Sequence, residues 1–204
     1  MAEIAALIPS ALAGVAQVGR LGLQTGPVGV IVWERAPFGV AALSVLAGKR
    51  EALAAAVSSA FGIPLPDPGK RMVGPKLALT GTGPDQWRAE AVDAPADGIE
   101  AFLRAALAPH AIVVDQSHAH IIVRLSGPRA RELLAAGVSI DLHPRAFTVG
   151  DAAQTMVAHI AVSIWQTAPD PVYEIAVPRS LFTSFWRWLE ASALRYGLEV
   201  QDTM

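Results

Sequence analysis

The residue types best suited to acid–base chemistry are five histidines and the acids beside them. Asp115, Ser117 and His118 lie in one short run and are the residue types of a hydrolase triad. A triad draws its members from separate chain segments, with the nucleophile on a sharp strand-to-helix turn. These three instead fit a single turn in which each side chain bonds the local backbone. We therefore predict that the run stabilises a turn and contains no catalytic residue.

The remaining histidines are candidate metal ligands. His120 follows closely at a strand start, Asp141 and His143 would point the same way along a strand, and His159 interrupts an apolar strand. A metal site needs about three or four converging donors, and no stretch of the sequence supplies them. We predict no metal-binding residue.

Three glycine-containing segments are candidate phosphate or dinucleotide sites. Gly81-Thr82-Gly83 lacks the third glycine of the dinucleotide motif and lies between two strands, where a hairpin turn is expected. Gly48-Lys49-Arg50 and Gly69-Lys70-Arg71 lack the upstream glycine and the hydroxyl residue of a phosphate-binding loop. We predict no cofactor-binding residue in this chain.

Composition narrows the class of protein. The 204 residues are 52% hydrophobic with a net charge of −2 and a mean hydropathy of +0.40, which indicates a globular chain without a basic surface for nucleic acid. Charged residues make up 17%, below the roughly 25% of soluble domains, so a partner is expected to cover part of the surface. The absence of cysteine fits a cytoplasmic protein. Glu3, Pro9 and Gly14 make a signal peptide or membrane span unexpected.

Hydrophobic periodicity and turn residues predict the elements that hold these side chains. The first half is expected to contain strands at 28–34 and 40–46, a helix at 49–61, strands at 76–80 and 87–92, a helix at 98–107 and a strand at 111–115. The first two strands are expected to form a hairpin around Pro37-Phe38-Gly39. The second half is expected to contain strands at 119–125, 156–165 and 172–177, a helix starting at Pro128, a helix at 180–196 and a last strand at 198–201.

The two halves follow one pattern. Gly48 and Gly127 each follow a strand and precede a helix, and each helix is followed by Ile-x-Leu, at 63–65 and 140–142. We predict an α+β fold of two ferredoxin-like βαββαβ halves related by duplication. The expected domains are an N-terminal arm at 1–27, a first half at 28–116 and a second half at 117–204, joined in one compact body.

Several sequence stretches resemble a known superfamily. Asp115-Gln116-Ser117-His118, followed by Val123-Arg-Leu-Ser-Gly127-Pro128, resembles the glycine-cleavage T-protein (aminomethyltransferase) superfamily. Ile140-Asp-Leu-His-Pro144, Phe147, Gln154-Thr155, Pro178-Arg179-Ser180-Leu181 and Trp186-x-Trp188-Leu189 resemble more specifically the gamma subunit of heterotetrameric sarcosine oxidase. The resemblance implies a T-protein-like folate-binding-domain fold. It also implies partners, the alpha, beta and delta subunits, that carry FAD, FMN, NAD, tetrahydrofolate and zinc.

This chain departs from the T-protein pattern where folate chemistry would occur. A folate-using member would have a glycine pair and a catalytic aspartate entering the strand that here runs from Val157 to Trp165, and this stretch contains no acid. Asp151 and Asp170 lie out of register, and Pro178 replaces an expected asparagine. Without the carboxylate the site has no group to handle the amine proton. We therefore expect a noncatalytic structural gamma subunit of a sarcosine oxidase, an oxidoreductase of sarcosine catabolism and one-carbon metabolism.

Two alternatives remain open. The chain could be an independent folate-binding or aminomethyltransferase-like protein that uses His118 or His159, or a free-standing interaction module. On the helix at 180–196, the core-facing stripe is Phe182, Phe185, Trp186, Leu189 and Ala193. At about 100° per residue, Trp188 falls roughly 120° from that stripe, on the side of Arg195. We predict that Trp188 and Arg195 anchor a partner subunit, unless the N-terminal arm at 4–23 covers the tryptophan.

Overall fold

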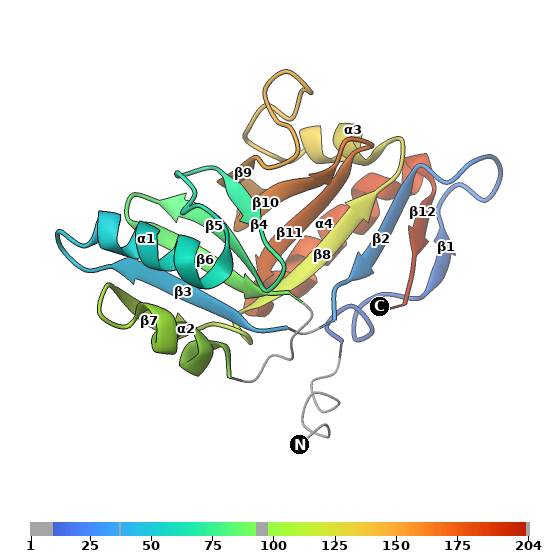
Figure 1. Ribbon diagram of the computed structural model, residues 1–204. Helices are drawn as coiled ribbons and strands as arrows, with labels where there is room; N and C mark the ends of the chain where they lie inside the picture. The colour runs from blue at the N-terminus through green and yellow to red at the C-terminus, as the bar shows by residue number, and fades with distance from the viewer. Residues whose placement is uncertain (1–9, 37, 93–97, 203–204) are drawn as a thin grey trace. The chain divides into compact units, whose positions relative to one another are not determined.

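The computed structural model describes residues 10–36, 38–92 and 98–202, which form two compact units (Figure 1). Unit 1 contains the described residues between 38 and 118, and unit 2 contains residues 10–36 and 119–202. From residue 10 onward, the described chain therefore runs through unit 2, forms unit 1 and returns to unit 2.

Unit 1 is a five-stranded antiparallel sheet with the strand order β4-β5-β6-β3-β7. Its elements are β3 (Val40–Val45), α1 (Arg50–Phe61), β4 (Arg71–Val73), β5 (Leu77–Gly83), β6 (Gln86–Ala91), α2 (Ile99–Leu107) and β7 (Ala111–Asp115). The buried side chains of α1 and α2, among them their leucines and Phe61, pack against alternate residues of the strands and form one core. Gly62 ends α1 with a φ of 69°, a conformation that glycine adopts at little cost.

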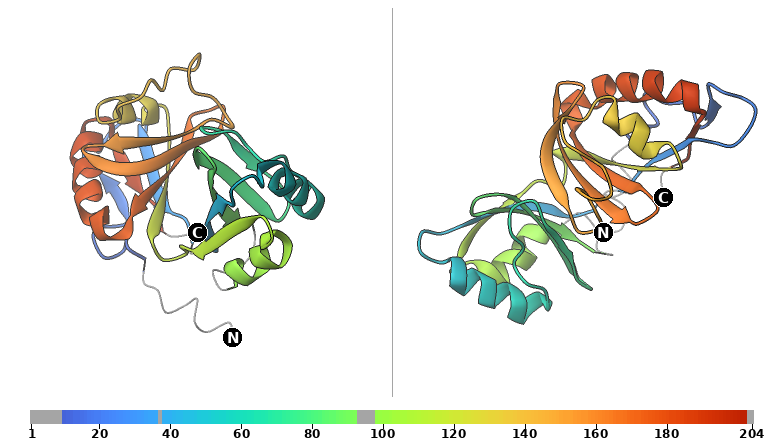
Figure 2. Two further views of the ribbon diagram at one scale, coloured as in Figure 1. Left: turned by 90° about the vertical axis from the view of Figure 1, so that its left-hand side faces the viewer. Right: turned by 90° about the horizontal axis from the view of Figure 1, so that it is seen from above.

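Unit 2 is built on a seven-stranded sheet with the order β1-β12-β2-β8-β11-β10-β9. Its elements are β1 (Gly19–Leu21), β2 (Val30–Glu34), β8 (His120–Ser126), α3 (Ala130–Ala135), β9 (Ala152–Val157), β10 (Ile160–Ala168), β11 (Val172–Pro178), η2 (Arg179–Leu181), α4 (Phe182–Ala193), η3 (Leu194–Tyr196) and β12 (Leu198–Val200). Helices α3 and α4 lie on the same face of this sheet (Figure 2). The five residues of α4 that were predicted to face the core are all buried in it: Phe182, Phe185, Trp186, Leu189 and Ala193.

The element order confirms the α+β fold and its ferredoxin-like halves. Both units run strand, helix, three strands, helix, strand, from β3 to β7 and from β8 to β12. In unit 1 the order β5-β6-β3-β7 is the split βαβ arrangement, with β4 added at one edge. The edge strands β4 and β9 occupy equivalent places in the two halves, and the sequence pattern did not predict β4.

The predicted hairpin between the first two strands was wrong. Strand β3 lies in the sheet of unit 1, whereas β2 inserts in unit 2 between β8 and β12, antiparallel to the first and parallel to the second. Residues 28–36, expected in the first half, thus belong to unit 2. Two valines of β2, Val30 and Val32, are fully buried in the unit 2 core, which stabilises this insertion.

The predicted strand at 156–165 was also wrong, because the chain reverses within it. Strands β9 and β10 pair as an antiparallel hairpin whose two turn residues are Ala158 and His159, with φ angles of 48° and 68°. Positive φ at both positions is the geometry of a two-residue turn that Asn-Gly usually fills. Because Ala-His carries no turn signal, the sequence concealed the turn.

The beginning of the described chain is attached to unit 2. The Glu34 carboxylate accepts hydrogen bonds from Ser10 Oγ (2.6 Å) and from the Leu12 amide (2.9 Å), and Leu12 is buried in the core. Strand β1 then pairs antiparallel with β12. The predicted arm therefore contributes to the sheet and the core. No helix among the described residues is long and apolar enough to span a membrane.

Candidate functional site

The triad-like run forms a turn, as predicted. The Asp115 carboxylate accepts a hydrogen bond from the Ser117 amide (2.8 Å). The Ser117 hydroxyl accepts one from the Val40 amide (3.0 Å) and lies 3.3 Å from the Val40 carbonyl. The two Ser117–Val40 interactions join the end of β7 to the start of β3 and so stabilise unit 1.

Asp141 and His143 lie in a loop, so the prediction that they share a strand face was wrong. The Asp141 carboxylate accepts a hydrogen bond from the His143 amide (2.8 Å), and Nδ1 of His143 accepts one from the Arg145 amide (3.2 Å). Their side chains therefore fix the loop backbone. In the described residues there is no cluster of three or more histidine or acidic side chains able to hold a metal ion.

The position expected to hold a folate-directed acid is part of the β9–β10 hairpin. His159 is exposed at its turn, and the following residues of β10 alternate between apolar and small side chains. Pro178 ends β11, where an asparagine was expected. The residues present do not fit folate chemistry, because no carboxylate stands where the amine proton would have to be transferred.

A polar row that the sequence analysis missed crosses four strands of unit 2. Trp33, Arg124, Glu174 and Trp165 are in register on β2, β8, β11 and β10. Glu174 Oε2 accepts hydrogen bonds from Trp165 Nε1 (2.9 Å) and Arg35 Nη1 (2.9 Å), and the Arg124 guanidinium lies 5.2 Å from the centre of the Trp33 ring. The buried Glu174 charge is thus compensated by the Arg35 guanidinium.

A second polar cluster that was missed lies in unit 1. Arg71 binds both carboxylate oxygens of Glu90 (3.1 and 2.8 Å) and the Thr80 hydroxyl (2.7 Å). Arg88 is 5% exposed, and burial lowers the pKa of its guanidinium, an effect that Glu90 opposes and Arg71 increases. The signal in the sequence was the alternation of Arg88 and Glu90 with apolar neighbours in β6, which places both on one face of the sheet.

The predicted interface residues lie on the outer side of α4 and on η3. Trp188 is half-buried, which corrects the expectation of an uncovered aromatic side chain. A Cβ added to Gly137, just after α3, would lie 2.7 Å from Cε2 of Trp188, and the Phe185 ring centre is 6.0 Å from that of Trp188. Packing against Gly137 at the end of α3 and against Phe185 therefore accounts for the partial burial of the tryptophan. Residues 4–9 of the arm that was expected to cover it lie outside the described residues. The partner-anchoring role stays a prediction.

Arg195 is exposed, with its guanidinium 4.6 Å from the centre of the adjacent Tyr196 ring. The Tyr196 hydroxyl lies 3.1 Å from Glu132 Oε1 on α3, and Glu132 Oε2 pairs with Arg129 (2.6 Å). Hydrogen bonds from Arg129 and from Tyr196 lower the pKa of the Glu132 carboxyl. The outer surface formed by α3, α4 and η3 therefore presents the partly exposed Trp188 side chain and the exposed Arg195 guanidinium.

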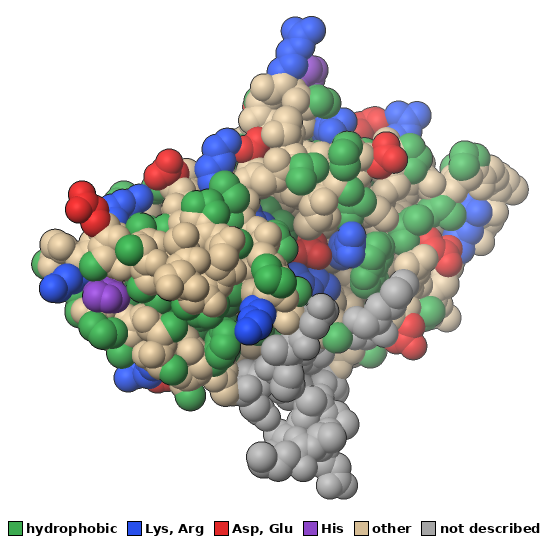
Figure 3. Space-filling view, viewed as in Figure 1, with side chains coloured by type: hydrophobic (Ala, Val, Ile, Leu, Met, Phe, Trp, Pro, Cys, Tyr) green, Lys and Arg blue, Asp and Glu red, His purple; other side chains and the backbone are tan. Residues whose placement is uncertain are grey.

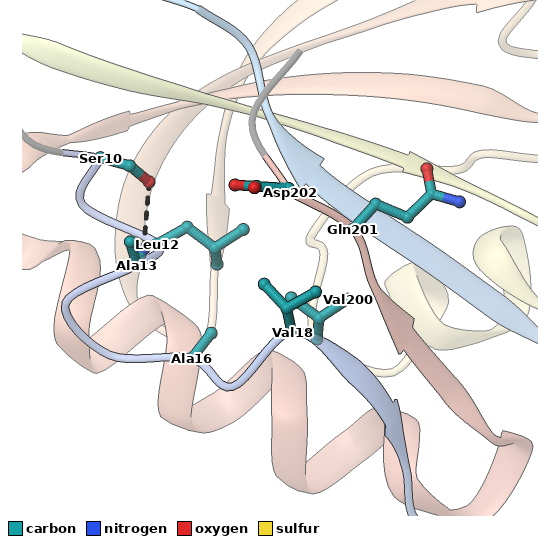
Figure 4. Close-up of a pocket in the computed structure, with 8 residues that line it drawn as sticks. All are labelled: Ser10, Leu12, Ala13, Ala16, Val18, Val200, Gln201 and Asp202. Carbon is teal, nitrogen blue, oxygen red and sulfur yellow. Dashed lines mark hydrogen bonds between the residues drawn. The ribbon is translucent and has the colours of Figure 1, made fainter.

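A small pocket lies where the beginning of the described chain meets the end of β12 (Figure 4). It is lined mostly by small and apolar side chains, and the Ala13 amide donates a hydrogen bond to Ser10 Oγ (3.0 Å) beside it. Its volume of about 10 Å³ is that of a single water site, so no flavin, nucleotide or folate fits there.

Comparison with known proteins places the chain in a family. Residues 47–194 match the sequence model of the "Sarcosine oxidase, gamma subunit family". The sarcosine oxidase gamma subunits of Arthrobacter sp and of Corynebacterium sp. (strain P-1) are each 36% identical over 132 residues, which is 63% of this chain and 63% of each relative. The matched region thus spans less than two thirds of the length of these relatives.

Two solved structures share the fold. Heterotetrameric sarcosine oxidase from Corynebacterium sp. U-96, in complex with pyrrole 2-carboxylate, superposes with a TM-score of 0.74 at 27% identity, over 84% of this chain and 87% of that one. The glycine cleavage system aminomethyltransferase T from Bartonella henselae superposes with a TM-score of 0.65 at 14% identity, over 86% of this chain and 48% of that one. The second likeness shows a T-protein-like fold alone. Because the family match covers well over half of its residues, the chain belongs to the sarcosine oxidase gamma subunit family.

Proposed function

We propose that this chain is a noncatalytic, structural gamma subunit of a heterotetrameric sarcosine oxidase. The assembled enzyme would convert sarcosine, water and dioxygen into glycine, formaldehyde and hydrogen peroxide, or pass the one-carbon unit to tetrahydrofolate. Family membership and the fold shared with a heterotetrameric sarcosine oxidase support this proposal. In it the chain is a subunit of an oxidoreductase and has no active site of its own.

The observation that carries the noncatalytic role is the β9–β10 hairpin. A tight turn at Ala158 and His159 and an apolar strand occupy the position where a folate-using relative would need a carboxylate. Of the glutamates buried in the described residues, Glu174 and Glu90 are paired with arginines, and Glu34 accepts hydrogen bonds from the Ser10 hydroxyl and the Leu12 amide. Each of these carboxylates thus has local partners that compensate its burial.

The partners of this proposal are the alpha, beta and delta subunits in the cytoplasm. The resemblance assigns the flavins FAD and FMN, the NAD and the tetrahydrofolate to the alpha and beta subunits, and zinc to delta. Trp188 and Arg195 remain the residues proposed to anchor a large subunit, through the partly exposed indole and the exposed guanidinium. Tryptophan and arginine are the residue types most enriched among binding hot spots.

Co-expression tests the proposal. The tagged chain, produced together with the alpha, beta and delta subunits of the same source, is expected to co-purify with them as a complex that oxidises sarcosine. The chain purified alone is expected to be colourless and inactive with sarcosine. Failure to assemble, or a stoichiometric flavin spectrum from the chain alone, would overturn the proposal.

A further inference from the structure

The segment at 139–151, here called the α3–β9 loop, joins α3 to β9 and projects from unit 2 (Figure 1). Side-chain hydrogen bonds hold its backbone along most of its length. Besides the turn made by Asp141 and His143, the Asp151 carboxylate accepts hydrogen bonds from the Thr148 amide (2.7 Å) and hydroxyl (2.9 Å). These hydrogen bonds restrain the loop backbone, although most of its residues are exposed.

Two apolar side chains anchor this loop to unit 2. Leu142 and Phe147 are 3% and 5% exposed and belong to the core, and the Phe147 ring centre lies 6.5 Å from that of Tyr173. The loop begins just after Gly137, on which the Trp188 ring rests. Trp188 is therefore a positioning residue for the base of the loop.

The exposed tip has a distinct chemistry. It carries His143, Pro144, Arg145, Ala146 and Val149, of which Val149 is 50% exposed. Within the described chain the Arg145 guanidinium makes no ion pair or hydrogen bond. Cationic, histidine and hydrophobic side chains are visible on this projection in the space-filling view (Figure 3). The carboxylates of Asp141 and Asp151 accept hydrogen bonds from the loop's own backbone. The tip therefore presents the Arg145 cation beside apolar side chains.

We propose that the α3–β9 loop is a preformed docking element for an acidic, partly apolar surface of a partner subunit. The inference rests on the proposed function and specifies a contact within that complex. The internal hydrogen bonds already restrain the loop before binding, so the loop loses little conformational entropy on association. The unpaired Arg145 supplies charge complementarity, which governs the association rate and the choice of partner.

Charge reversal at the tip tests this inference in the co-expressed complex. Arg145→Glu is expected to weaken binding of the chain to the remaining subunits by at least about tenfold, because an attraction becomes a repulsion. Arg145→Lys is expected to stay within about threefold of wild type, since it keeps the charge. The matched control is Lys76→Glu, which makes the same charge change at an exposed site in unit 1.

Two further measurements separate docking from folding. The thermal midpoint of isolated Arg145→Glu should match that of wild type, and added salt should no longer slow its association as it slows that of wild type. Asp141→Ala, which frees the His143 amide, should slow association with little change in the midpoint. Equal binding of Arg145→Glu and wild type would overturn the docking role while leaving the subunit assignment standing. If the wild-type chain itself fails to assemble, both proposals fall.

Discussion

The indole of Trp188 on α4 rests on Gly137, so closely that a Cβ at position 137 would overlap the ring. This contact joins the end of α3 to the outer side of α4, and the loop that follows α3 starts from it. Position 137 requires glycine because the Trp188 ring approaches its Cα closely. The backbone does not require it, since Gly137 does not have a positive φ.

Gly137→Ala should lower the free energy of unfolding by about 1–3 kcal/mol, because the added methyl group must displace the indole or the backbone. Urea denaturation followed by tryptophan fluorescence measures the change. Gly14→Ala is the matched control, since a Cβ there meets only the Ala11 carbonyl at 3.6 Å. Equal stability of the two variants would show that Trp188 moves aside freely.

Trp188→Ala should destabilise the isolated chain by about 1–3 kcal/mol, because a half-buried ring leaves the α3–α4 contact. Trp188→Phe should recover part of this loss through its contact with Phe185.

Arg195→Ala changes an exposed side chain and should alter the free energy of unfolding by only about 0.5 kcal/mol. If both residues anchor a partner, each alanine variant should weaken assembly by about 2 kcal/mol in pull-down titrations. Unchanged assembly of Arg195→Ala would remove that residue from the interface.

His159→Gly should raise the free energy of unfolding by about 1 kcal/mol. At a φ of 68° a side chain is strained, and glycine adopts this conformation without that cost. Thermal denaturation checks the sign. Thr155→Gly, placed in regular β9 strand, should instead destabilise the chain, because there glycine only adds freedom to the unfolded state.

The stabilising effect of Glu132 should depend on pH in the acid range. Hydrogen bonds from Arg129 and Tyr196 lower the pKa of its carboxyl in the folded chain, so the effect is present above the unfolded-state pKa and is lost as pH falls through the lowered value. The difference in thermal midpoint between wild type and Glu132→Gln should therefore shrink between about pH 5 and about pH 3. Tyr196→Phe should reduce this pH dependence, and a difference that stays constant would contradict the assignment.

Calorimetric titration of the isolated chain with tetrahydrofolate should show no binding in the micromolar range. The β9–β10 hairpin offers a turn and an apolar strand in place of the carboxylate that folate chemistry needs. Micromolar affinity would favour the independent folate-binding alternative. In that event loss of binding in His159→Ala would identify the residue responsible.

The sequence by itself determined most of the helices and strands, because their signals are local. Apolar periodicity and terminal glycines such as Gly62 place α1, α2 and α4 within a few residues of their observed bounds. The repeated order of elements predicted two related halves, and the motifs around Asp115 and Ile140 predicted the family. The turn role of Asp115 and Ser117 was also predictable, since it involves neighbours in the chain.

Only the tertiary structure decided which strands pair and which side chains meet. The apolar pattern of β2 (Val30–Glu34) would fit either sheet, and only the tertiary structure shows that β2 pairs with β8 and β12 in unit 2. The turn at Ala158 and His159 is imposed by pairing of β9 with β10 against the local preference of both residues. The Trp33 to Trp165 row brings β2 and β8 together with the β10–β11 pair, which lies far from both of them in the chain. Such contacts depend on strand register and on distance in space, and the sequence of a single segment specifies neither.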